Sequence, residues 1–387
     1  MGCRVLQVIP AVAPRYGGPS VAVVGIARAL AAQGHNVQIV TTDADGRGRL
    51  PVQTDVDLLY QGVPIRFFRR EFSESFKWSR PLAEWLERRV GEFDVVHVHA
   101  VFSHSSIAAG RACRAHGVPY IVRPLGTLDP WSLSRHAWRK RLLMELGVRN
   151  LLRGAAALHY TSEDEQTLAR QALPWLPKGV IVPIGVDDAL FGGGEAHTSA
   201  QPYALFLGRL DAKKGVDLLI RAFHEVVGRR PHDDRLRLVI AGEGDASYTD
   251  ELRHLAQGGP ASNRIEFRGW VDGPERETLL REALLFVLAS HQENFGIAVV
   301  EAMASGVPVI VTRSVNLAGA IADGHAGWVI ERSEPALAAA IIAALENEPE
   351  RRTRGHNARR AAEQFRWPAI GARLGDLYAR LQMRATA

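Results

Sequence analysis

The sequence has little cysteine and no long apolar run. Cys3 and Cys113 are its only cysteines, too few for a disulfide framework, so a reducing compartment is the simpler interpretation. No stretch approaches the roughly 18 apolar residues of a membrane span. The start, MGCRVLQVIPAV, is typical of a first strand and not of a signal peptide. These absences favour a cytoplasmic protein, or one that is peripheral on the inner face of the membrane.

Low-complexity tracts and repeats of a short fixed period are also missing. At 387 residues the chain is too long for one ordinary hydrophobic core, so two domains are expected. The formal net charge is +5 and the isoelectric point is near 9.4. This mildly basic balance suits anionic small molecules, acidic lipid surfaces or nucleic acid, and alone it chooses none of them.

Short apolar runs alternate with helical patterns through most of the chain. The runs are RVLQVIPAV, HNVQIVTT, DVVHVH, VPYIVRP and AAALHYTS, then YALFLGRL, RLRLVIAGEG, RIEFRGW, LLFVLAS, VPVIVTR and GWVI. Such alternation indicates an α/β fold with helices on both faces of a parallel sheet. Between the two series, residues 191–202 read FGGGEAHTSAQP, which predicts a domain linker.

We therefore expect two Rossmann-like, doubly wound domains, residues 1–190 and 200–366, that face a central cleft. Ligands of such sheets bind at the carboxyl ends of strands, and cofactor sites favour domain interfaces. The last pattern, WPAIGARLGDLYARLQ, is amphipathic and no strand follows it. We expect this helix, residues 367–387, to pack back on the first domain.

A basic loop follows the first strand of the second domain. The strand ends at Gly208, Arg209 follows it, and Lys213 and Lys214 precede a helix that begins near Gly215. Two cations beside the N–H groups of a helix start would hold a diphosphate. The alternative is a solvated loop that happens to be basic.

Two carboxylates flank an apolar segment in ENFGIAVVEAMASG. The helix is expected to begin near Gly296, whose missing Cβ lets a phosphate approach the N–H groups of residues 296–298. Glu293 precedes this helix and Glu301 lies within it; an ionised carboxylate can accept two hydroxyl groups of a ribose or a hexose. The alternatives are a core helix with ordinary acids and a glycoside-hydrolase pair. The glycine and the basic loop favour a phosphorylated ligand, which a hydrolase does not need.

The first βα turn, VIPAVAPRYGGPSVAVV, places Gly17 and Gly18 before a helix. Backbone could approach an anion there too, although the spacing is not the G-x-G-x-x-G of dinucleotide-binding folds. A tight turn without a ligand is the alternative.

Three histidines occur in DVVHVHAVFSHSS. His97 and His99 share one side of a strand, and His104 follows them. A zinc site is disfavoured because no carboxylate or cysteine ligands accompany these histidines, and we expect the histidines to pack on the strand or to line a cleft.

The segment DPWSLSRHAWRKRLLMELGVRNLLRG combines tryptophans and leucines with a run of cations. A basic amphipathic helix with tryptophans can lie on an anionic membrane surface, so residues 131–149 are a candidate docking segment. A solvated surface helix is the alternative.

In their order and spacing, GRLDAKKGVDLLIRAF, VIAGEGD, IEFRGWVDGPERETLL, ENFGIAVVEAMASGVPVI and IADGHAGWVI resemble the retaining glycosyltransferases of family 4, which have the GT-B fold. Glu293 and Glu301 match the E-x7-E element of that family. The YGGP loop and DVVHVH extend the resemblance over nearly the whole chain. The stretch RPLGTLDPWSLSRHAWRKRL is similar to members associated with bacterial exopolysaccharide or lipid-linked glycan assembly.

The resemblance implies roles for the matching residues. Arg209 and Lys214 would hold the donor diphosphate and Glu293 would contact the transferred sugar, so these three are the catalytic candidates. Glu301 would bind the ribose hydroxyls. The other donor-side candidates are Gly208, Phe295, Gly296, Ile297 and Ala298 near the phosphate and sugar, Trp270 and Val271 near the base, and Gly17 and Gly18 beside the reacting centre. Such enzymes need no bound metal, because the two cations stabilise the leaving group.

Two positions depart from the family pattern. Many relatives have a histidine in the loop after the VPYIV strand, but here that loop is RPLGTLD, with Leu125 and Gly126. Its role is either lost or supplied by another residue, and the acceptor-side candidates are His104, Arg123 and Gly126. The common PNGVD is PIGVD here, with Ile184 in place of asparagine.

The sequence thus predicts a retaining hexosyltransferase that acts in cell-surface polysaccharide synthesis. The donor would be a UDP or GDP sugar, and the acceptor a glycan or polyprenyl-linked molecule. Further partners would include an anionic membrane surface through residues 131–149, and no nucleic acid. A GT-B sugar-nucleotide epimerase and a non-catalytic glycan-binding or scaffold subunit stay open as alternatives.

Overall fold

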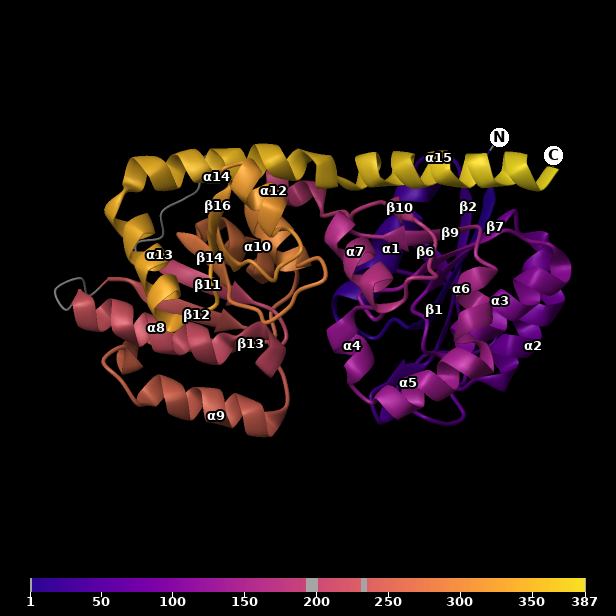
Figure 1. Cartoon of the computed structure of the whole chain (residues 1–387), viewed down its shortest axis with the longest axis horizontal. Helices are drawn as coiled ribbons and strands as arrows, with labels where there is room; N and C mark the ends of the chain where they lie inside the picture. Colours follow the sequence, from indigo (N-terminus) through magenta and orange to yellow (C-terminus); the bar gives the residue numbers. More distant parts are fainter. Residues whose placement is uncertain (1, 193–200, 231–234, 387) are drawn as a thin grey trace. The chain divides into compact units, whose positions relative to one another are not determined.

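The computed structural model describes residues 2–192, 201–230 and 235–386. They form two compact units (Figure 1): unit 1 holds the chain up to Gly185 and again from Trp367, and unit 2 holds Val186–Arg366. Residues 193–200 of the predicted linker lie outside the described residues. The first change of unit falls before the predicted boundary at residue 190, because η4 (Asp188–Phe191) is a 3-10 turn whose Phe191 ring packs within unit 2 under Arg366.

Unit 1 is built on an eight-stranded sheet in the order β10-β9-β8-β7-β1-β2-β6-β5. All neighbouring pairs are parallel except β5–β6 at one edge. The strands are β1 (Arg4–Ala11), β2 (Asn36–Thr42), β5 (Asp57–Tyr60), β6 (Val63–Phe68), β7 (Val95–His99), β8 (Tyr120–Arg123), β9 (Ala157–Tyr160) and β10 (Val180–Ile181), with a separate hairpin of β3 (Ala44–Asp45) and β4 (Gly48–Arg49).

Both faces of this sheet are covered by helices (Figure 1). Val5 and Ile9 point to a core shared with the first and last helices, whereas Leu6 and Val8 point to a core on the opposite face, as the period of two along a strand requires. The helices are α1 (Gly18–Ala31), α2 (Arg80–Arg89), α3 (His104–His116), α4 (Pro130–Ser134), α5 (Ala137–Leu143), α6 (Arg149–Arg153), α7 (Glu163–Ala172) and α15 (Trp367–Thr386), with the short turns η1 (Pro14–Tyr16) and η2 (Val90–Glu92) and the π-helical turn η3 (Met144–Val148).

Unit 2 has a fully parallel six-stranded sheet in the order β13-β12-β11-β14-β15-β16. Counted from its first strand this is 3-2-1-4-5-6, the doubly wound order. The strands are β11 (Tyr203–Leu207), β12 (Arg237–Ala241), β13 (Ile265–Gly269), β14 (Leu285–Leu288), β15 (Val309–Thr312) and β16 (Gly327–Ile330). The predicted α/β fold with two parallel, Rossmann-like sheets is confirmed.

The helices of unit 2 connect these strands as crossovers and then extend its C-terminal part. They are α8 (Val216–Arg229), α9 (Ala246–Gln257), α10 (Gly273–Glu282), α11 (Ile297–Ala304), α12 (Ala318–Asp323), α13 (Glu334–Glu346) and α14 (Glu348–Ala362), with the 3-10 turns η5 (Ala212–Lys214), η6 (Ser262–Arg264) and η7 (Glu363–Phe365). The charge-rich α14 leads to the last residue of unit 2, Arg366.

A buried polar chain fastens α15 to the sheet of unit 1. The Tyr378 hydroxyl lies 2.8 Å from His97 Nδ1, His97 Nε2 lies 3.1 Å from His159 Nδ1, and His159 Nε2 lies 2.7 Å from the carbonyl oxygen of Val182. Burial lowers the pKa of both histidines, so they are neutral and can pass hydrogen bonds in one direction along this chain. His97 is thus packed within the sheet, as one of the two expected placements of these histidines requires. Among the described residues, no group of three or more His, Cys, Asp or Glu is placed to hold a metal ion.

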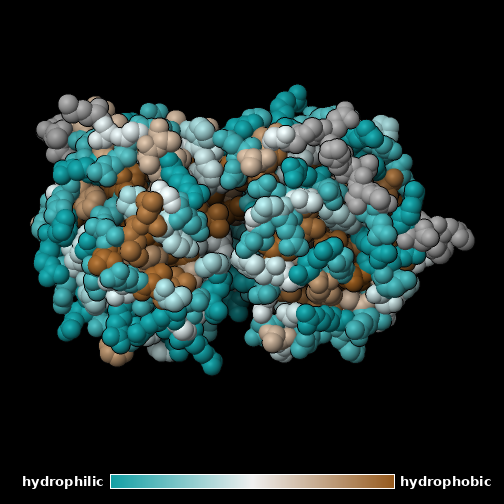
Figure 2. All heavy atoms as spheres, turned by 180° about the vertical axis from the view of Figure 1, so that it is seen from behind, coloured by the Kyte–Doolittle hydropathy of each residue, from teal (hydrophilic) through white to brown (hydrophobic). Residues whose placement is uncertain are grey.

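The surface is mixed in character. On the face that Figure 2 shows, hydrophobic residues form scattered patches among hydrophilic ones. No helix within the described ranges is both long and apolar enough to cross a bilayer.

We predict that Tyr378→Phe destabilises the protein. The substitution leaves His97 Nδ1 and the Gln7 amide, which donates to the same hydroxyl at 3.3 Å, buried without a partner. The loss should be about 1–3 kcal/mol, visible as a lower thermal midpoint. Tyr60→Phe is the control, since that ring is half-buried at the edge strand and its loss should stay within ~0.5 kcal/mol. Equal midpoints for the two variants would contradict the prediction.

Candidate active site

The switch point of the unit 2 sheet gathers the charged donor-side candidates. The chain order reverses between β11 and β14, and ligands of doubly wound folds bind outside the carboxyl ends of the strands at such a point. Arg209 and Lys214 follow β11, and Glu293 follows β14. Two loops that are far apart in sequence, one cationic and one acidic, therefore leave the sheet side by side.

Backbone contacts press these two loops together. Gly215 has a φ of 67°, and a Cβ there would overlap the carbonyl group of Ala289, just after β14. Only glycine meets both conditions without strain. The N–H of His291 donates to the carbonyl oxygen of Lys213 at 2.8 Å. The cationic loop is thereby held directly against the acidic one.

Lys214 Nζ and Glu293 Oε2 form an ion pair, with 21% and 14% of their side chains exposed. The backbone of Glu293 is fixed on both sides, because its N–H donates to the Ser314 carbonyl and its own carbonyl accepts from the Asn316 N–H, each at 3.0 Å. Arg209 is exposed on the cationic loop. The arrangement offers fixed positive charge for a phosphate and a rigidly placed carboxylate for hydroxyl groups.

Helix α11 begins beside this ion pair without a side-chain cap. Gly296 is its N-cap with a φ of 76°, and a Cβ there would lie 3.2 Å from Glu293 Cγ. Phe295 is buried, whereas the first turn, Ile297–Ala298, is partly exposed. The predicted helix start is confirmed, and its positive end is open to an anion.

Glu301, in α11, is nearly inaccessible and is paired with Arg276 of α10 through Oε2 and Nη2. Burial raises the pKa of Glu301 above its ordinary value, and Arg276 opposes that rise. Sequence reasoning missed Arg276. The only available signal was that a buried carboxylate requires a cation, and the basic series of unit 2 offers many candidates.

The strand ends beside these residues are rich in glycine. A Cβ on Gly242, after β12, would overlap the carbonyl oxygen of Gly208, after β11, and the Gly242 N–H donates to the Gly269 carbonyl at 2.6 Å. Trp270 and Val271 follow directly; Trp270 is half exposed and Val271 is buried. Close backbone packing thus leaves an exposed indole at the end of β13, where a base was expected to bind.

In unit 1 the order of strands reverses between β1 and β7. Gly17 lies in the loop after β1, with φ 70° and ψ −135°, and is the N-cap of α1, which begins at Gly18. Ser20 lies inside the helix, and its hydroxyl donates to the Ala13 carbonyl at 3.1 Å. The predicted glycine turn therefore stands at the switch point of its own sheet, where ligands of such folds bind.

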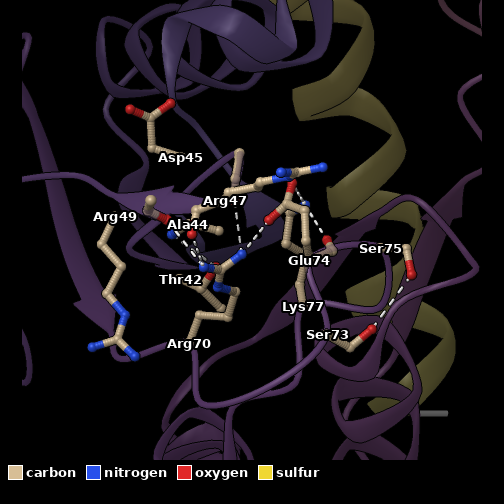
Figure 3. Close-up of polar contacts among 12 residues, drawn as sticks. Thr42, Ala44, Asp45, Arg47, Arg49, Arg70, Ser73, Glu74, Ser75 and Lys77 are labelled. Atoms are coloured by element: carbon tan, nitrogen blue, oxygen red, sulfur yellow. Dashed lines mark hydrogen bonds and ion pairs between the residues drawn. The ribbon is translucent and has the colours of Figure 1, made fainter.

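A polar network braces the residue before that glycine turn. The Tyr16 hydroxyl donates to Glu74 Oε1 at 2.7 Å and accepts from the Gly46 N–H at 2.9 Å. Glu74 is held in turn by Arg70 and by Lys77, as Figure 3 shows. Burial and the Glu74 bond raise the pKa of Tyr16 to about 12, so its hydroxyl remains a donor. Nothing local in the sequence revealed this network.

His104 is the first residue of α3, which follows β7. Its ring lies against Trp78, with centroids 4.0 Å apart and planes tilted by 30°, and its Nδ1 accepts from the Ser79 N–H at 3.3 Å. Burial lowers its pKa, so the ring is neutral at physiological pH. It lies at the switch point of unit 1 but is packed by an aromatic neighbour.

Arg123, the last residue of β8, is only 1% exposed. Its Nε and Nη1 atoms have no hydrogen-bond partner among the described residues, and burial lowers its pKa to about 10. Gly126, in the loop that follows, has a φ of 68° and donates its N–H to Glu165 Oε1 at 2.7 Å. The structure thus buries the Arg123 side chain and uses the Gly126 N–H in a hydrogen bond within unit 1.

We predict that Arg276→Met destabilises the protein in a pH-dependent way. Without Arg276 the pKa of buried Glu301 rises further above 4.5. A group with a raised folded-state pKa loses its stabilising effect as pH rises through that pKa, so the deficit should be small below pH 4.5 and larger at neutral pH, about 1–3 kcal/mol.

Thermal unfolding from acid to neutral pH measures this difference. Adding Glu301→Gln to Arg276→Met removes the charge, so the double variant should lose the pH dependence of the deficit. A deficit that is equal at all pH values would show that the ion pair is not its cause.

Two family models match the chain. Residues 17–185 match the glycosyl transferase 4-like domain, and residues 194–361 match the glycosyl transferases group 1. A D-inositol 3-phosphate glycosyltransferase of Corynebacterium efficiens is 26% identical over 363 residues, covering 88% of this chain and 80% of that protein. D-inositol 3-phosphate glycosyltransferase 2 of Catenulispora acidiphila is 28% identical over 393 residues, covering 94% and 90%.

Solved structures share the fold over nearly the full length. HepE of Anabaena, in complex with UDP and glucose, has a TM-score of 0.79 at 20% identity, covering 98% of this chain and 100% of that one. Sucrose-phosphate synthase of Thermosynechococcus elongatus has a TM-score of 0.78 at 23% identity, covering 99% and 100%. With a family model matched in each half, the chain belongs to the glycosyltransferases of family 4, retaining enzymes with the GT-B fold.

Proposed function

We propose that this enzyme moves a hexose-type sugar from a nucleotide-diphosphate donor to a glycan or lipid-linked acceptor, with retention of configuration. The observation that carries the proposal is the cation–carboxylate pair of Lys214 and Glu293 beside the uncapped start of α11, at the switch point of unit 2. Such a donor is a nucleoside diphosphate, made of a base, a ribose and two phosphates, that is joined to the sugar. HepE of Anabaena was crystallised with UDP and with UDP-glucose, which supports a UDP-type donor, with GDP as the alternative.

The cations and the carboxylates have different roles in this proposal. Arg209 and Lys214 hold the diphosphate and stabilise the negative charge that grows on it as the sugar leaves. Glu293 accepts hydroxyl groups of the sugar, and Glu301 accepts those of the ribose through the oxygen that Arg276 does not occupy. Phosphate and sugar also meet the N–H groups of residues 295–298, and the base lies against Trp270 and Val271.

The reaction would proceed on one face of the sugar. The bond from the anomeric carbon to the diphosphate oxygen breaks, a bond to the acceptor oxygen forms on the same face, and the acceptor proton passes to the leaving diphosphate. The two cations supply the stabilisation for which other transferases use a metal, so the proposal requires no cofactor. Unit 1 would present the acceptor beside Gly17 and Gly18.

The proposal extends to the cellular setting. Residues 131–149, which combine cations with tryptophans, support an enzyme in the cytoplasm that is peripheral on the inner face of the membrane. The resemblance of RPLGTLDPWSLSRHAWRKRL to members of such pathways supports a place in cell-surface polysaccharide synthesis, such as exopolysaccharide assembly. An acceptor linked to a polyprenyl carrier would be met at that surface.

Lys214→Ala tests the assignment. Turnover with a nucleotide sugar and its acceptor should fall on the order of 10²–10³-fold, because a group that stabilises the leaving diphosphate is removed. Arg221→Ala is the matched control, since Arg221 is an exposed cation of α8 that pairs with Asp217 at the surface; its turnover should be unchanged.

Near-wild-type turnover of Lys214→Ala at equal thermal stability would contradict the proposed role. Mass spectrometry of the donor incubated alone separates the alternatives. Isomerisation without transfer would indicate an epimerase, and calorimetry without nucleotide binding would indicate a non-catalytic subunit.

A further inference from the structure

Four large apolar side chains are exposed within one short segment of unit 1. They lie in the basic segment, residues 129–153, which comprises α4, α5, η3 and α6. Trp131 is 41% exposed, Trp138 67%, Leu142 52% and Leu146 67%. Scattered single apolar residues are normal on a protein surface, but a group of this size calls for a partner.

The exposure does not come from poor packing of the helices. The inward side of the same segment packs normally, because Met144, Val148 and Leu151 are buried in the core that also contains Leu6 and Val8. Trp138 and Leu142 are four residues apart on α5, and Leu146 follows four residues later, so the three project from one outward side. The segment therefore has two apolar sides, and unit 1 covers one of them.

Positive charge surrounds the outward apolar side. The basic segment contains six Lys or Arg residues and only two acids, a net charge of +4 against +5 for the whole chain. Arg135 lies over the Trp131 ring, 4.9 Å from its centroid, and Arg139 lies over the Trp138 ring at 5.2 Å. Each exposed indole thus carries a guanidinium on its face.

This combination fits the boundary between lipid headgroups and acyl chains. Indole rings favour that boundary, leucines enter the acyl region beneath it, and long cationic side chains reach back to anionic headgroups. A soluble acidic protein would match the charge, but it would leave the exposed tryptophans and leucines without an apolar partner.

We propose that the outward side of the basic segment docks unit 1 on an anionic lipid bilayer. The binding requires both the charges and the apolar side chains, and it does not depend on the sugar or the nucleotide. It adds to the proposed function a reason for an acceptor held at a membrane.

Vesicle flotation of the full chain tests the proposal. Wild-type protein should float with vesicles of equal parts phosphatidylcholine and phosphatidylglycerol and should stay in solution with phosphatidylcholine alone. The triple variant Arg135→Gln, Arg139→Gln, Arg141→Gln should bind on the order of 100-fold more weakly, since each cation near an anionic surface adds about a fivefold gain. Its control, Arg80→Gln, Arg88→Gln, Arg89→Gln in α2, removes the same charge from exposed positions elsewhere in unit 1 and should bind like wild type.

A second pair of variants tests the apolar part. Trp138→Ser should weaken flotation at least about tenfold with every charge kept, whereas Leu59→Ser, which alters an exposed residue of edge strand β5, should not. Absence of wild-type flotation, or equal loss in a variant and its control, would overturn the proposal. Nucleotide binding measured by calorimetry should be unchanged in all four variants, so failure here is distinct from failure of the proposed transferase activity.

Discussion

The candidate site of unit 2 depends on one close approach, that of Gly215 to the carbonyl group of Ala289. The approach is possible because Gly215 has no Cβ and adopts a left-handed conformation. It sets the loop after β11 against the loop after β14, and so determines that Lys214 meets Glu293. The backbone that carries these two charges is therefore positioned by packing within unit 2, and only the side chains need to change partners when a ligand competes for them.

The two ion pairs of unit 2 differ in what they permit. Lys214 and Glu293 are both partly open to solvent, so a phosphate can compete for the lysine while a hydroxyl competes for the carboxylate. Until then each charge neutralises the other, which lowers the cost of keeping both in a protein environment. Glu301 is much more buried, and its cation Arg276 keeps an otherwise costly charge in place. The Lys214–Glu293 pair is therefore suited to exchanging its partners for a ligand, whereas Arg276 holds the Glu301 carboxylate in a fixed orientation.

Local sequence patterns were enough to predict the fold and part of the candidate site. Alternating strands and helices predicted the two parallel sheets, and the glycine before Ile297 predicted the start of α11, because both depend on neighbours in sequence. The Arg276–Glu301 pair and the brace around Glu74 depend on side chains brought together by the fold, and several arginines were equally plausible in sequence. Arg123 shows the same limit: it was a candidate to replace the histidine that the family resemblance led us to expect, whereas its burial became evident only in three dimensions.

The histidines of unit 1 constrain how a proton could move in the proposed reaction. His97, His99 and His159 are buried and their pKa values are lowered by burial, with Arg123 adding to the effect. Side chains without solvent contact cannot take a proton from an acceptor hydroxyl. The loop after β8, residues 124–129, contains no histidine, and His104 already uses Nδ1 on the Ser79 N–H. Under the proposed function, the leaving diphosphate would therefore be the base that takes the proton of the acceptor hydroxyl, and Arg209 and Lys214 would set its basicity.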